Sequence, residues 1–227
     1  MAQSLEMSFS PGRCVRYSKR FIRLCNQVND AQQLIADVQN AINDVQQKES
    51  TFDASEDNVN YAYDTTQLRD NNLDNKVRDT AEDCKKTDRN NLQSQVFSMV
   101  FPRTVTSIIN SNDQVQITEV LKIIDRIRNL GPDHPLQKSA AELQLLVDES
   151  KEAFKSLDEA KGIRNSSKAD LDAAKFKLVQ TYNNTILKSI QLFGRKTTDK
   201  LFPNIYPKKG STIGEESDQT EDTIAAT

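Results

Sequence analysis

A regular series of apolar residues near the start of the chain constrains the fold more than any other feature. The series recurs every three or four residues for more than three heptads, and its members are Phe21, Leu24, Val28, Ala31, Ile35, Val38, Ile42 and Val45. This spacing places every member on one stripe of an α-helix, because the helix has 3.6 residues per turn. The sequence therefore predicts a helix over residues 16–50, which ends where Glu49 interrupts the stripe.

The scarcity of chain-breaking residues extends this prediction to the whole chain. The 227 residues include only 6 Gly, 6 Pro and no Trp, whereas strand-rich folds need more turn residues and aromatics. Mean hydropathy is low, at −0.67. The regular apolar spacing nevertheless argues against a chain that is disordered throughout. The predicted fold class is all-α.

Further apolar stripes predict three more helices. The second runs from a cap at Ser55 to Pro102, with a very polar stretch over residues 64–72. The third helix follows residues 103–113, which are predicted to form a loop or a small β-hairpin. This helix is interrupted at Gly131–Pro135. The fourth follows a turn over residues 162–167 and ends before Pro203.

Together these helices predict an elongated up-down-up-down four-helix bundle made of two long helical hairpins. The expected divisions are an N-terminal basic arm (1–15), a first hairpin (16–102), a linker (103–113), a second hairpin (114–205) and a disordered acidic tail (206–227). The narrow apolar seams of such long helices also favour self-association or incorporation into a larger assembly.

The distribution of charge predicts a binding surface, although the net charge is only −3. Residues 7–29 hold five Arg or Lys and no acid, and the up-down topology brings them to the same end as the basic end of the fourth helix. The same topology adds the cations of residues 103–128. The predicted partner-binding residues are Arg13, Arg16, Lys19, Arg20, Arg23, Arg195, Lys196, Lys200, Phe202 and Tyr206.

Three interpretations of this basic, aromatic-rich end stay open. Arg and aromatic side chains are the usual anchors of protein interfaces, which favours a structural or assembly subunit. Basic residues interleaved with aromatics are also typical of a surface for nucleic acid or an anionic membrane. The third interpretation is that the aromatics close the bundle and the charges form an ordinary solvated face. The leading hypothesis is the assembly subunit.

The sequence offers no recognisable catalytic, cofactor-binding or metal-binding residues. His134 is the single histidine, and it lies between Asp133 and Pro135 in a helix-breaking turn. Zinc sites need clustered Cys and His, and phosphate loops need a glycine-rich turn after a strand. No carboxylate is expected in an apolar setting that raises its pKa. We therefore predict a protein that is not an enzyme.

The cysteines and the chain start bear on location. The odd number of cysteines, Cys14, Cys25 and Cys84, fits a reducing compartment better than a disulfide framework. Cys14 is expected to be exposed among basic residues and therefore the most reactive. No signal peptide is evident in residues 1–11, and no apolar run is long enough to span a bilayer. The expected location is the cytoplasm or a virus particle.

Overall fold

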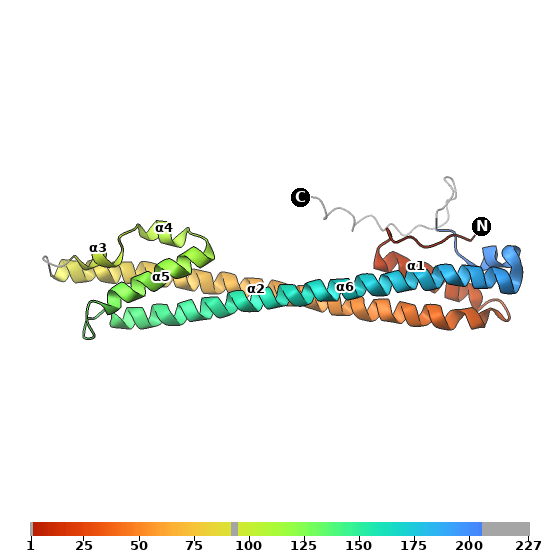
Figure 1. Cartoon of the computed structure of the whole chain (residues 1–227), viewed down its shortest axis with the longest axis horizontal. Helices are drawn as coiled ribbons and strands as arrows, with labels where there is room; N and C mark the ends of the chain where they lie inside the picture. Colours follow the sequence, from red (N-terminus) through yellow and green to blue (C-terminus); the bar gives the residue numbers. More distant parts are fainter. Residues whose placement is uncertain (1, 92–94, 206–227) are drawn as a thin grey trace. The chain divides into compact units, whose positions relative to one another are not determined.

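The computed structural model describes residues 2–91 and 95–205, and the regular elements of these residues are all helical. Their order is α1 (Pro11–Cys25), a short 3-10 helix η1 (Ala31–Leu34), α2 (Ile35–Asn90), α3 (Val96–Val100), α4 (Val105–Ile109), α5 (Asp113–Arg128) and α6 (Gln137–Leu201) (Figure 1). The all-α prediction is confirmed for this part of the chain. The predicted acidic tail, 206–227, lies outside the described residues.

The predicted four-helix arrangement does not match this order, because two of its turns are wrong and its first helix, 16–50, is broken. The break lies between α1 and α2, where Asp30 has a φ of +70°. Residues 50–55 and 162–167 lie inside α2 and α6, which continue through them as helix. Ser55, the expected cap, is buried, and its hydroxyl donates to the carbonyl of Phe52 at 2.6 Å. Hydroxyl side chains satisfy helix carbonyls one turn back as readily as they cap a helix start, so a run of Ser, Thr and Asp does not need to end a helix.

The other predicted break is present, and the predicted linker is partly helical. Gly131, with φ +108°, and the turn that follows it separate α5 from α6. Residues 105–109 form α4, capped by the Thr104 hydroxyl, which accepts from the backbone N–H of Ser107 at 3.3 Å. The β-hairpin alternative for this segment is therefore wrong.

The chain divides into two compact units, each containing part of α2 and part of α6. The first unit comprises residues 1–49 and 170–227, and the second comprises residues 50–169. Ion pairs show that the two helices are antiparallel in both: Asp37 pairs with Lys188 and Lys48 with Asp170 in the first unit. In the second unit, Arg69 pairs with Glu149.

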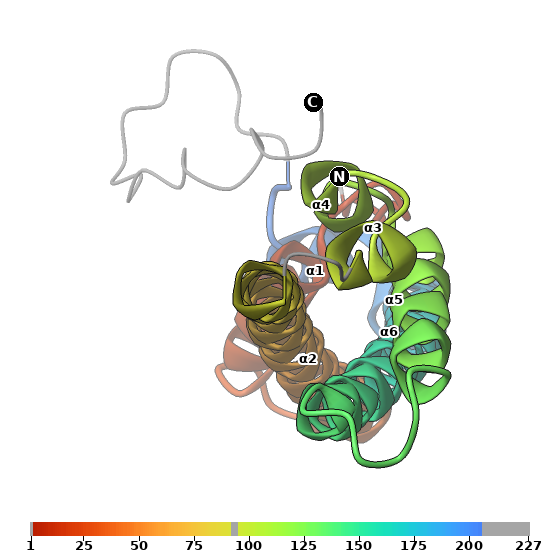
Figure 2. The same cartoon turned by 90° about the vertical axis from the view of Figure 1, so that its left-hand side faces the viewer.

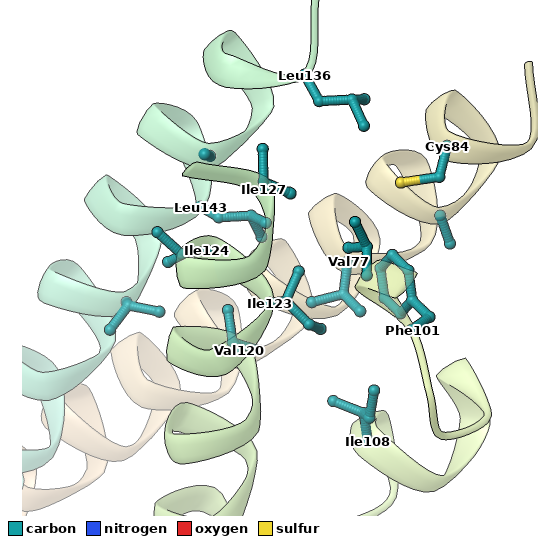
Figure 3. Close-up of a cluster of buried hydrophobic side chains, with 14 of the residues drawn as sticks. Val77, Cys84, Phe101, Ile108, Val120, Ile123, Ile124, Ile127, Leu136 and Leu143 are labelled. Atoms are coloured by element: carbon teal, nitrogen blue, oxygen red, sulfur yellow. The ribbon is translucent and has the colours of Figure 1, made fainter. Parts of the chain in front are cut away.

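The second unit is closed by an aliphatic core. The helix α5 packs against α2 and α6 and buries three isoleucines between them, Ile123, Ile124 and Ile127 (Figure 3). Val77 comes from α2 and Leu143 from α6 (Figure 3). The short helices α3 and α4 lie beside α5 (Figure 2).

The first unit is closed by aromatic rings. Phe21 of α1 stacks on Phe202 with ring centroids 4.4 Å apart, and it meets the edge of Tyr182 at 5.8 Å. The chain supplies Phe202 directly after α6. Gly194 kinks the last part of that helix, with φ +72° and ψ +166°. This conformation is accessible essentially to glycine alone. The kink is held by a buried hydrogen bond between the hydroxyls of Ser189 and Thr198, at 2.9 Å.

Candidate binding surface

The helix α1 carries the centre of the predicted binding surface. Ser10 caps it by accepting from the backbone N–H of Arg13 at 3.3 Å, and Pro11 occupies its first turn. Residues 11–15 of the predicted arm are therefore helical. The buried face of α1 consists of Cys14, Val15, Ser18, Phe21 and Cys25.

Four cations form a stripe along the opposite, exposed face of α1. They are Arg16, Lys19, Arg20 and Arg23, and we call them the cationic stripe. Their spacing of three and four residues sets like charges next to one another on the helix surface. Such like-charged neighbours destabilise a helix by about 0.2–0.5 kcal/mol for each pair.

The three predicted cations of α6 lie in the same unit. Arg195, Lys196 and Lys200 follow the kink at Gly194 and are all exposed. The chain beyond them returns to α1, since the Tyr17 hydroxyl donates to the carbonyl of Ile205 at 3.1 Å.

Ion pairing distinguishes these cations from many of those of the second unit. Within the described residues, Lys19, Arg20, Arg23, Arg195, Lys196 and Lys200 form no ion pair. Cations of the second unit are commonly paired, and examples are Arg69–Glu149 at 2.7 Å, Lys85–Glu82 at 2.7 Å and Lys122–Glu119 at 2.8 Å. The first unit thus presents positive charge that its own described residues do not compensate.

Two of the predicted residues do not lie on this exposed surface as expected, and a third falls outside the described residues. Phe202 is only 4% exposed and belongs to the aromatic core, so it is not available as a surface anchor. Arg13 is half-buried, with its guanidinium 4.0 Å from the centre of the Phe9 ring. Tyr206 lies outside the described residues.

The predicted topology also grouped other cations with this surface, whereas these cations belong to the other compact unit. Arg103, Lys122, Arg126 and Arg128 belong to the second unit. Glu119 pairs with Arg103 at 3.6 Å as well as with Lys122. The error follows directly from the two turns that the chain does not make.

Cys14 lacks the exposure that would make it the most reactive cysteine. All three are free and buried, and Cys14 is fully buried instead of exposed. Burial raises the pKa of the Cys14 thiol, although the positive charges of Lys175 and Arg13 partly offset it. Burial raises the pKa of both Cys25 and Cys84 to about 12. A raised pKa leaves little thiolate at neutral pH.

Two carboxylates depart from the expectation that none has a raised pKa. Partial burial raises the pKa of Asp70, and the charges of Asp74 and Asp113 add to the effect. Burial also raises the pKa of Asp74, which accepts a hydrogen bond from Gln116 at 2.6 Å. Neither carboxylate lines the grooves that lie between α2 and α6 in the two units.

A polar groove of about 410 Å³ lies between α2 and α6 in the first unit. Its lysines already have acidic neighbours: Lys188 is 3.3 Å from Asp37 and Lys177 is 3.6 Å from Asp44. His134, in the second unit, accepts from the backbone N–H of Leu136 at 3.3 Å and so has a role in the turn before α6. Within the described residues, no cluster of His, Cys, Asp or Glu could hold a metal ion.

Comparisons with known proteins find no matching family model, no matching curated protein and no matching solved structure. In the part of the chain that the structure describes, no helix is both long enough and apolar enough to cross a membrane.

Proposed function

We propose that this chain is a non-enzymatic structural or assembly subunit that docks an acidic partner through the cationic stripe of α1. The observation that carries the proposal is the set of exposed cations in the first unit that have no ion pair among the described residues. Charges that destabilise their own helix and neutralise nothing within it have their use outside the fold.

The chemistry of the stripe limits the kind of partner. Phe21 and Phe202 are packed in the aromatic core and cannot serve as apolar anchors, so we expect the contact to be mainly electrostatic. Arg is favoured for such contacts because its planar guanidinium bonds a carboxylate or phosphate through two N–H groups. The partner therefore presents a row of carboxylates or phosphates.

The same observation favours nucleic acid or an anionic membrane as the second candidate. A surface of cations without exposed aromatic anchors binds a polyanion through its charge, and its affinity then falls steeply with salt. Localisation follows the partner: an assembly role fits the cytoplasm or a virus particle.

The test compares two triple variants that remove the same charge. Lys19→Gln, Arg20→Gln and Arg23→Gln remove three of the four cations of the stripe. Lys151→Gln, Lys155→Gln and Lys161→Gln remove three exposed cations of the second unit. Fluorescence anisotropy measures binding to a labelled poly-glutamate peptide and to a labelled 30-nucleotide single strand between 50 and 300 mM salt. We expect the stripe variant to weaken binding at least tenfold and to lower the salt slope by roughly 2–3 for the strand.

The control triple variant is expected to bind like the wild type. Preference for the peptide supports the assembly role, and preference for the nucleotide strand supports the second candidate. Equal losses in both triple variants, or no binding to either probe by the wild type, would contradict docking through the stripe.

A further inference from the structure

The second unit has a groove on the side of the α2–α6 pair that α5 leaves uncovered. The groove measures about 310 Å³, and it is lined by Tyr61, Ala62, Thr65, Arg69, Glu149, Glu152, Ala153 and Ser156. The helix α5 marks the other side, because its Gln116 bonds to Asp74 of α2. Helical periodicity sets Asp74 and Thr65 on opposite sides of the seam with α6.

Two ion pairs fix which residues of the two helices lie level with each other. Arg69 pairs with Glu149, and Lys76 pairs with Glu142. The residue numbers of both pairs add to 218. In this unit, residue n of α2 therefore lies level with residue 218 − n of α6.

Four large apolar side chains on the groove side are exposed by 58 to 76%, namely Tyr61, Leu68, Leu145 and Ile163. Each lies at the groove or two helical turns from it. Leu68 follows Tyr61 by seven residues, Leu145 precedes Glu152 by seven, and Ile163 follows Ser156 by seven. Residues seven apart share a helix face, so the four side chains lie along one surface, which we call the groove face.

The groove face has a symmetry that a contact with an unrelated partner does not require. Tyr61 and Leu68 are centred between residues 64 and 65 of α2, and Leu145 and Ile163 are centred on residue 154 of α6. By the register above, residue 154 lies level with residue 64. The midpoint of the apolar pair on α2 and the midpoint of the apolar pair on α6 thus lie at nearly the same level.

We propose that a second copy of this chain docks on the groove face through a twofold axis at that level, perpendicular to the helices. In a twofold contact, a residue above the axis meets its counterpart below it. This axis sets Tyr61 against Leu68 of the second copy and Leu145 against Ile163 of the second copy. It also sets Glu152 level with Ser156 of the second copy, whose hydroxyl can donate to the carboxylate.

The size of the groove face sets the strength of the contact. Leu145 and Ile163 are 18 residues apart, about 27 Å along a helix, and two helices are about 20 Å wide. Each copy therefore contributes roughly 500 Å², below the ~800 Å² per partner of standard interfaces. The Arg69–Glu149 pair at 2.7 Å neutralises charge at the centre. The expected contact is a reversible, concentration-dependent dimer.

This inference goes beyond the proposed docking function, because it uses residues of the second unit only. The decisive experiment is sedimentation velocity from 1 to 300 µM on three proteins. The wild type is expected to shift toward the dimer with concentration. The variant with Leu68→Lys and Ile163→Lys is expected to dimerise at least tenfold more weakly. The control Leu187→Lys, equally exposed but in the first unit, is expected to match the wild type.

A cysteine placed at the axis tests the geometry separately. Thr65→Cys lies at the axis, so its copies are expected to form a disulfide on mild oxidation. Asn72→Cys is separated from its counterpart by 15 residues, about 22 Å, and is not expected to crosslink. The three natural cysteines are buried and leave a low background.

The outcomes are distinct from those of the stripe experiment. Three outcomes would each overturn the proposal. The wild type could stay monomeric at 300 µM, the groove-face variant could dimerise as strongly as the wild type, or residues 65 and 72 could crosslink equally. The stripe variant is expected to dimerise normally, so loss of polyanion binding and loss of the dimer report on different surfaces.

Discussion

Both units contain parts of α2 and α6, but different segments of the chain pack against these two helices in each unit. In the first unit, α1 and the segment after Gly194 supply an aromatic core of Phe21 and Phe202 around Tyr182. In the second unit, α5 supplies isoleucines to an aliphatic core (Figure 3). The surfaces differ as well, since the second unit pairs many of its cations, whereas Lys19, Arg20 and Arg23 of the first unit form no ion pair within the described residues.

The first unit thus combines a complete buried core with a surface whose positive charge is not balanced. Both units bury their seams, so neither needs the unpaired charge of α1 for its own stability. A helix that gains its stability from the buried face can carry a repulsive stripe on the other face at modest cost. The unbalanced surface is therefore where a partner is sought.

The largest expected effect comes from removing the central ring of the first unit. Phe21→Ala deletes a fully buried side chain that contacts two other rings, and it is expected to lower the free energy of unfolding by about 3–5 kcal/mol. Urea unfolding followed by circular dichroism measures the loss. Hydrogen exchange is expected to rise in α1 and to change little in α5.

Ile124→Ala is the matched variant in the second unit, and it is expected to raise exchange in α5 and spare α1. If Phe21→Ala raised exchange equally in α5, the two units would unfold together and the comparison between them would fail.

The buried seams and the turn at Gly131 were predictable from the sequence, whereas the turns predicted at residues 50–55 and 162–167 do not form. Apolar spacing identified Ile42 and Leu143 as buried, because periodicity depends only on the residue types. Ser55 misled the prediction because its hydroxyl bonds within α2 as readily as it would cap a helix. Which alternative wins depends on the antiparallel seam with α6, and this partner lies far away in the sequence.

Only part of the candidate binding surface was predictable from the sequence. The cations of α1 stand out from composition alone, and the structure leaves Lys19 and Arg23 exposed. The burial of Phe202 depends on the kink at Gly194 and on the return of the chain to α1, neither of which has a periodic signal. Leu68 was overlooked within a very polar stretch. Its spacing of seven residues from Tyr61 is the signal that could have identified the groove face.

A smaller effect is expected from a substitution at Gly194, which tests whether the first unit needs the kink in α6 to complete its aromatic core. Gly194→Ala forces an L-residue into a conformation with positive φ, and it is expected to cost about 1–3 kcal/mol. No atom lies within 4 Å of the added methyl group, so the cost is conformational and not steric. Thermal unfolding gives the difference.

Gly12→Ala is the control, because Gly12 lies in α1 and also has open space around it. This substitution is expected to stabilise the protein by about 0.4–1 kcal/mol, since alanine loses less entropy in a helix. Equal effects of the two substitutions would mean that the kink at Gly194 is not needed to close the first unit.

The smallest effect at neutral pH tests a fault in the aromatic core. The Tyr182 hydroxyl is buried and has no hydrogen-bond partner among the described residues, which costs about 1–3 kcal/mol for such a group. Tyr182→Phe is therefore expected to stabilise the first unit by about 1 kcal/mol at pH 7. Phe21→Tyr serves as the opposite change and is expected to destabilise it.

The pH dependence of Tyr182→Phe separates burial of the hydroxyl from a hidden hydrogen bond. Burial raises the pKa of Tyr182 above its ordinary value near 10, so the native state favours the neutral phenol. Below pH 10 the phenol is neutral in both the folded and the unfolded chain, so its contribution to the free energy of unfolding does not change with pH. Above pH 10 the phenol ionises more easily in the unfolded chain, so the free energy of unfolding falls as the pH rises. The advantage of the phenylalanine variant is thus expected to grow above pH 10, by up to about 1.4 kcal/mol per pH unit. Urea unfolding of both proteins at pH 7 and pH 10.5 measures this growth, and a variant that is less stable at pH 7 would reveal a partner for the hydroxyl.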